Sequence, residues 1–106
     1  MTDLYGIFYS PAALEDLRLI YKYIWDNLNE TETARKQTDR IRKSIRTLEL
    51  FPKKHQVVGW EPWQSKGMRQ MPVDNFVVYY TVDDKENKVI VVRIFYGGRN
   101  VEKIIE

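Results

Sequence analysis

Apolar residues at the start of the chain form first a short continuous run and then a helical repeat. The run Leu4 to Tyr9 is rich in aliphatic and aromatic residues and predicts a strand. Ser10-Pro11 predicts a helix start, because serine caps well and proline at the first helical position lacks an N–H that would be unpaired anyway. Apolar residues then recur at steps of mostly three or four, which predicts a helix with one buried stripe. The stripe comprises Leu14, Leu17, Tyr21, Ile24, Trp25 and Leu28.

A second helix is predicted to run to about Leu50. The segment before it, Asn27 to Thr33, holds two good capping residues and separates the two helices. Phe51-Pro52 ends the second helix, because proline disfavours helical geometry in the residue before it. The buried side of this helix is predicted to comprise Ala34, Ile41, Ile45 and Leu48. The other sides carry Arg35, Lys36, Arg40, Arg42, Lys43 and Arg46, so the pattern predicts a helical hairpin with one basic arm.

The second half of the chain predicts a loop and three strands. Residues 53–66 show no hydrophobic period and contain Gly59 and Pro62, as a loop does. Strands are predicted over 67–73, 76–82 and 89–96, the last two joined by a polar turn. The run 89–92 is apolar without alternation, which predicts a central strand covered on both faces.

The order β-α-α-β-β-β predicts an α+β fold, in which a helical hairpin packs on one face of a mainly antiparallel sheet. A chain of 106 residues has room for one domain, so residues 1–106 are expected to form a single unit.

Composition excludes several classes of site. The chain has no cysteine, which excludes disulfides, a thiol nucleophile and zinc sites built on thiolates. It has one histidine, His55, so a site with several histidine ligands is excluded, and we expect neither a metal nor another cofactor. The longest apolar run is five residues and no basic-then-apolar leader begins the chain, so we expect a cytoplasmic protein without membrane contact.

Charge is separated along the chain although the net charge is only +2. Residues 35–69 hold ten basic and three acidic residues, whereas the rest holds seven basic and twelve acidic ones. A basic middle region favours binding to nucleic acid or to an acidic protein, and a solvated helix face is the alternative. Lys53, Lys54 and Lys66 are the binding candidates in the loop, because they would add attraction for phosphate to that of the helix.

Three motifs in the right order and spacing resemble the RelE/ParE superfamily of toxins from bacterial type II toxin–antitoxin pairs. They begin at Phe8-Tyr9-Ser10-Pro11, at Gly67-x-Arg69 and at Val92-Arg93, and the third closes with Tyr96-Gly97-Gly98-Arg99-Asn100. The closing motif is most similar to the ParE-type ending. The resemblance implies the fold predicted above, a cognate antitoxin as partner and growth arrest as the outcome.

The resemblance implies different targets for different members. RelE-type toxins cut messenger RNA in the ribosomal A site with basic residues on the sheet, whereas ParE-type toxins poison DNA gyrase. Here the first strand of the second motif keeps only Arg69, and apolar Val77 lies near the position of an arginine in RelE-type toxins. We therefore expect a ParE-like toxin. A RelE-like endoribonuclease is the second hypothesis, and an interaction module that has lost toxicity is the third.

Few residues are suited to catalysis if the chain is a nuclease. RNA cleavage without a metal needs a base, a cation on the phosphate and an acid. Arg99, matched by the resemblance, joins Tyr96 and Arg69 as the catalytic candidates. His55, flanked by lysine, is expected to stay neutral and to belong with the binding residues.

Arg93 interrupts an apolar strand, and burying an unpaired guanidinium is costly. It is expected either to reach a carboxylate such as Asp74 or Asp83, or to open onto a surface that binds nucleic acid or the antitoxin. Trp60 and Trp63 in the loop have three possible uses: stacking on bases, anchoring a protein contact, or folding the loop onto the core.

Overall fold

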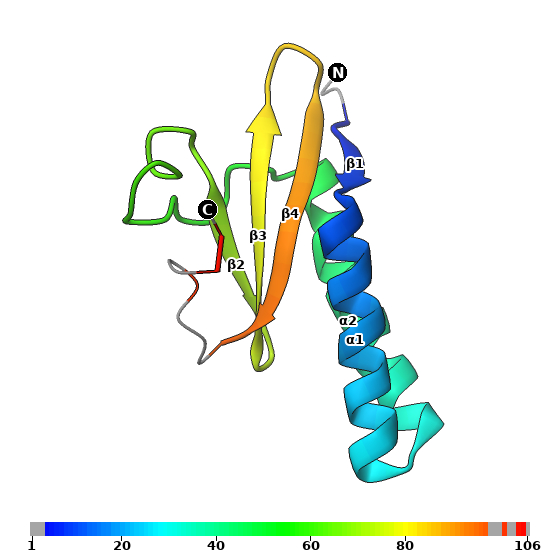
Figure 1. Ribbon diagram of the computed structural model, residues 1–106. Coiled ribbons are helices and arrows are strands. Elements are labelled where there is room, and N and C mark those ends of the chain that lie inside the picture. The colour runs from blue at the N-terminus through cyan, green and yellow to red at the C-terminus, as the bar shows by residue number, and fades with distance from the viewer. Residues whose placement is uncertain (1–3, 98–100, 102–103, 106) are drawn as a thin grey trace.

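The computed structural model describes residues 4–97, 101, 104 and 105. Two helices lie side by side on one face of a four-stranded sheet (Figure 1). The elements are β1 (Gly6–Tyr9), α1 (Pro11–Leu28), α2 (Thr31–Arg46), the 3₁₀ turn η1 (Thr47–Glu49), β2 (Arg69–Val73), β3 (Phe76–Asp83) and β4 (Lys88–Tyr96). The predicted order and α+β class are confirmed.

The strands follow the order β1-β4-β3-β2, and only the β1–β4 pair is parallel. The prediction that 89–92 belongs to a central strand is confirmed, since β4 lies between β1 and β3. Its pairing with β3 contains an irregularity: Tyr79 pairs with Arg93, whereas Tyr80 pairs with Val91. Val92 is therefore the extra residue of a β-bulge, which changes the faces to which its neighbours point.

The first helix begins where the sequence predicts. Ser10 Oγ accepts a hydrogen bond from the Ala13 amide at 2.9 Å and donates one to the Val92 carbonyl at 2.7 Å. The predicted stripe is only partly buried: Leu17 is covered, but Leu14 and Trp25 remain 49% and 45% exposed. The helix carries apolar residues on two sides, and the sheet covers one of them.

The second helix ends earlier than predicted. Its last regular residue is Arg46, and residues 47–49 tighten into a 3₁₀ turn before Pro52. The tighter turn brings Leu48 into the core, as expected for a helix that must stop before proline. The predicted buried side is confirmed, with Thr38 added to it.

Apolar side chains pack on both faces of the sheet. The main core lies between the helices and the sheet and includes Leu17, Ile41, Tyr80 and Val91. A second core covers the opposite face, where residues 57–68, together with Val101 and Ile105, pack over the strands. Its buried members are Val58, Met68, Tyr79, Phe95, Val101 and Ile105. In the part of the chain that the structure describes, no helix is long and apolar enough to cross a membrane.

Candidate functional site

The catalytic candidates do not come together. Arg69 begins β2 and pairs with Tyr80, whereas Tyr96 ends β4 and pairs with Phe76. Their partners lie four positions apart on β3, roughly 13 Å along an extended strand. Arg99 lies outside the described residues, so the structure does not place it. The sheet therefore carries two separate surfaces that each hold sequence-predicted residues.

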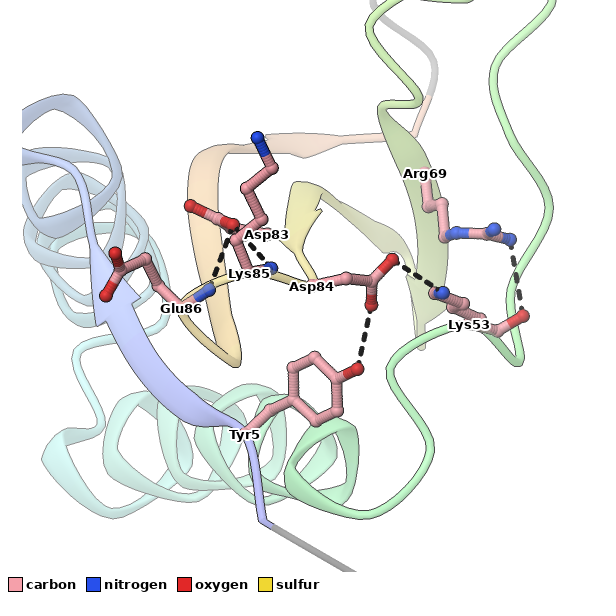
Figure 2. Close-up of polar contacts among 7 residues, drawn as sticks. All are labelled: Tyr5, Lys53, Arg69, Asp83, Asp84, Lys85 and Glu86. Carbon is pink, nitrogen blue, oxygen red and sulfur yellow. Dashed lines mark hydrogen bonds and ion pairs between the residues drawn. The ribbon is translucent and has the colours of Figure 1, made fainter.

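A polar cluster closes the end of the sheet near Arg69 (Figure 2). The Asp84 carboxylate lies between Lys53 Nζ, at 2.7 Å, and Tyr5 Oη, which donates to it at 2.8 Å. Hydrogen bonds from Lys53 and then Tyr5 hold the pKa of Asp84 below its usual range, and the hydrogen bond to Asp84 raises the pKa of Lys53. Lys53 thus joins the loop to the β3–β4 turn, although an exposed pair of this kind adds little stability.

The Arg69 side chain binds the backbone of the loop that precedes β2. Its Nη1 donates to the carbonyl of Lys53 at 3.2 Å (Figure 2). It also donates to the carbonyl of His55 at 2.6 Å. Tyr80 Oη donates to the Pro52 carbonyl at 2.8 Å, and burial raises the pKa of Tyr80 to about 12. A phenol with that pKa keeps its proton near neutral pH, so this end of the sheet is organised to fix the loop.

His55 is half-buried at the same end of the sheet. Burial, and then the charge of Lys54, lower the pKa of His55. The prediction of a neutral histidine is confirmed in direction, but burial is a larger cause than the neighbouring lysine on which the prediction rested. A neutral imidazole can accept a proton.

Arg93 reaches a carboxylate, which confirms one of its two predicted states, but the partner is Asp16 and neither Asp74 nor Asp83. Its Nε and Nη2 donate to the two carboxylate oxygens at 2.8 and 3.0 Å, and Asp16 also accepts the Ile94 amide at 2.9 Å. The hydrogen bonds to Asp16 raise the pKa of Arg93. Strand β1 ends before this point, so the Asp16 carboxylate takes the place of a neighbouring strand at the edge of β4.

The two expected partners of Arg93 are engaged elsewhere. Asp74 binds Arg40 at 2.6 Å and Gln37 at 3.0 Å, which joins α2 to the β2–β3 turn. Asp83 accepts backbone amides in the β3–β4 turn (Figure 2). Sequence reasoning missed Asp16 because it lies 77 positions away on a helix.

Trp60 and Trp63 fold the loop onto the second core, which confirms one of the three predicted uses. Trp60 meets Tyr79 edge to face, with ring centroids 6.1 Å apart. Lys66 Nζ lies 4.9 Å from the centre of the Trp63 ring, so this binding candidate rests on an aromatic face. Tyr79 is a core residue and only 5% exposed.

An apolar groove of about 720 Å³ lies between α1 and the ends of β3 and β4. Leu19 and Tyr23 border it from the helix, 49% and 68% exposed, and Tyr96 borders it from the sheet, 57% exposed. Sequence reasoning singled out Tyr96 but missed the two helix residues, which lie four positions apart beside the predicted stripe. The complete lining is Asp16, Leu19, Ile20, Lys22, Tyr23, Ile24, Asp26, Phe76, Ile94, Phe95 and Tyr96.

The structural comparisons identify the class of fold. A chain of a chromosomal ParDE toxin–antitoxin system from P. aeruginosa superimposes with a TM-score of 0.73 at 17% identity, covering 90% of this chain and 98% of the other. RelE–RelB complexes also match. The one from Pyrococcus horikoshii gives a TM-score of 0.62 at 16% identity, covering 91% of this chain and 98% of the other. The one from Mycobacterium tuberculosis gives a TM-score of 0.61 at 15% identity, covering 88% of this chain and 98% of the other. The fold is that of the RelE/ParE toxins.

The sequence places the chain within that class. The profile of the family described as "ParE toxin of type II toxin-antitoxin system, parDE" matches residues 7–101. The chain therefore belongs to the ParE toxin family, and the suspected resemblance is confirmed. No curated protein sequence gives a significant match. A toxin of this kind has a cognate antitoxin as its partner.

Proposed function

We propose that this protein arrests bacterial growth by binding DNA gyrase, and that its antitoxin neutralises it by occupying the groove beside α1. The gyrase target is what ParE-type membership implies. The observation that supports a binding role is the second core, which fills part of the sheet face opposite the helices.

The second core leaves little polar surface on that face. Tyr79 and Phe95 point away from the helices and are 5% and 2% exposed. RelE-type toxins display basic residues on the sheet to hold RNA, whereas here the loop with Trp60 and Trp63 packs over the strands. Apolar packing of this kind offers phosphate no hydrogen-bond donors, so it supports binding through another surface.

The distribution of groups that could move protons supports the same proposal. His55 and Tyr80 lie at one end of the sheet, and Tyr96 lies at the other. General acid and base groups must lie within about 3 Å of the atoms that they serve, so groups at opposite ends cannot act on one phosphodiester. A nuclease would have to use one end alone.

The groove beside α1 has the chemistry of a site for an amphipathic antitoxin segment. Exposed Leu19, Tyr23 and Tyr96 surround apolar walls, and the Tyr96 ring is held edge to face against Phe76 at 5.8 Å. A helix that inserts apolar side chains at a spacing of three and four residues would bury them here. Lys22 and Asp26, an ion pair at 3.6 Å on the rim, would fix its register.

Induced expression in a bacterial host tests the proposed target. Plasmid supercoiling and the incorporation of labelled amino acids would be measured separately at short times after induction. We expect negative supercoiling to fall first and protein synthesis to decline later. Early arrest of translation with cut messenger RNA would favour the RelE-like endoribonuclease instead. Normal growth at confirmed expression would contradict both toxin hypotheses and favour the third, an interaction module that has lost toxicity.

A further inference from the structure

The outer surface of α2 concentrates positive charge. Residues 31–46 include six basic and two acidic side chains, whereas residues 11–28 of α1 include two basic and three acidic ones. The two helices lie side by side (Figure 1), so the α2 side of the hairpin is more basic than the α1 side.

Two of the basic residues on α2 are engaged within the protein. Arg35 binds Glu32 at 2.8 Å, and Arg40 binds Asp74 at 2.6 Å. The other four are exposed and form no ion pair with any residue that the structure describes. These four, which we call the α2 cations, are Lys36, Arg42, Lys43 and Arg46.

The α2 cations share one side of the helix. At 100° per residue they fall within an arc of about 120°, away from the buried row that includes Thr38 and Ile45. Their backbone positions span about 15 Å along the axis, at 1.5 Å per residue. The Arg42 guanidinium lies 5.9 Å from the centre of the Tyr9 ring, which limits its freedom. The same arc also holds Asp39 and the Glu32–Arg35 pair, so this side is a partly ordered row of cations with a net charge of +3, five basic residues against two acidic ones.

We propose that the α2 cations bind the phosphate backbone of double-stranded DNA. The same 15 Å of duplex carries about nine phosphates on its two strands, enough to face all four cations. An exposed helix with its side chains is about 10–12 Å wide and matches the major groove of B-DNA, whereas the major groove of duplex RNA is too narrow and deep.

The composition of the surface favours nucleic acid over an acidic protein. The centres of protein interfaces are rich in aromatic and other large apolar residues. None of the exposed large hydrophobic residues found in the described part of the chain lies on α2. Single-stranded nucleic acid is disfavoured for a related reason, since stacking on bases needs exposed aromatic rings. The inference does not depend on the proposed gyrase target.

The test compares two variants that lose the same charge. The first is Arg42→Gln, Lys43→Gln and Arg46→Gln together, on the α2 surface. The control is Arg18→Gln, Lys85→Gln and Lys88→Gln together, on other elements. Binding to a 25-base-pair duplex would be followed by fluorescence anisotropy between about 25 and 200 mM salt, with thermal unfolding confirming that both variants fold.

We expect the wild-type chain and the control to bind with a similar dependence on salt. The α2 variant should lose roughly 2 to 3 from the slope of log K against log salt, at about 0.9 per phosphate contact. Equal losses in the two variants would overturn the proposal and show an effect of net charge alone. Absence of wild-type binding, or tighter binding to single-stranded RNA or to polyglutamate than to the duplex, would also overturn it.

Discussion

The carboxylate of Asp16 joins two elements that are distant in sequence. It accepts three hydrogen bonds, two from the Arg93 guanidinium and one from the Ile94 amide, and its side chain is 8% exposed. Removing one partner of a buried pair leaves the other without its charge complement, which is costly. Arg93 is 28% exposed, so water recovers part of that cost.

Asp16→Asn should therefore lower the free energy of unfolding by roughly 2–3 kcal/mol, below the full range for a completely buried pair. Urea denaturation measures the change. Asp26→Asn is the control on the same helix, because its pair with Lys22 is exposed and should contribute less than about 1 kcal/mol. Equal effects of the two substitutions would show that the Asp16 pair adds no stability.

His55 predicts a pH dependence of stability. Burial lowers the pKa of His55 in the folded chain, so near and below its ordinary value of about 6.5 the unfolded chain binds more protons. Stability should rise with pH through that range and should level off above about pH 7. His55→Gln should flatten this part of the curve in denaturation experiments between pH 5 and 8. An unchanged slope in that variant would contradict the assignment.

Tyr96 and Arg99 separate a binding role from a catalytic one. The Tyr96 hydroxyl lies on an exposed residue, and its ring packs against Phe76. Tyr96→Phe keeps the ring, so a gyrase-binding toxin should stay toxic, whereas a nuclease that uses the hydroxyl should lose about 10²-fold or more in rate.

We expect Arg99→Ala to remove most toxicity, because a charge-assisted contact contributes about 1.5–3 kcal/mol. Full toxicity of Arg99→Ala would show that the functional site does not include Arg99. Growth after induction measures the effect of both substitutions.

At the scale of elements, helix α1 presents apolar residues on two sides, and only one side is covered by the sheet. Leu14 and Leu19 are both 49% exposed, but only Leu19 borders the groove. The helix therefore provides a matched pair of positions for testing whether the groove receives the antitoxin.

Leu19→Ala should weaken antitoxin binding by about tenfold, which corresponds to about 1.4 kcal/mol for a residue in the middle of an apolar contact. Leu14→Ala should leave the affinity within about twofold. Isothermal titration with the cognate antitoxin measures both constants. A larger effect at Leu14 would place the antitoxin on the other side of the helix.

Local signals predicted most of the elements but not their distant contacts. Ser10-Pro11 and Pro52 act on adjacent backbone, so the start of α1 and the end of the α2–η1 segment were predictable. The partner of Arg93 was not, because several acidic residues were chemically suitable and only the bulge at Val92 and the end of β1 select Asp16. The groove was missed for the same reason, since its two walls come from opposite halves of the chain.

At the scale of the whole molecule, the sheet is covered on both faces. The helices cover one face, and the loop with Trp60 and Trp63 covers part of the other. The exposed features of the described residues include a groove, a polar cluster around Asp84 and a basic helix surface. This distribution supports a protein that acts through contacts with other macromolecules.

The most direct test of that account uses the purified toxin in two reactions side by side. One follows DNA supercoiling by gyrase on relaxed plasmid, and the other follows messenger RNA on programmed ribosomes. The account predicts that the toxin inhibits supercoiling, that added antitoxin restores it, and that the messenger RNA stays intact. Ribosome-dependent cleavage of the messenger RNA, with supercoiling unaffected at the same toxin concentration, would contradict it.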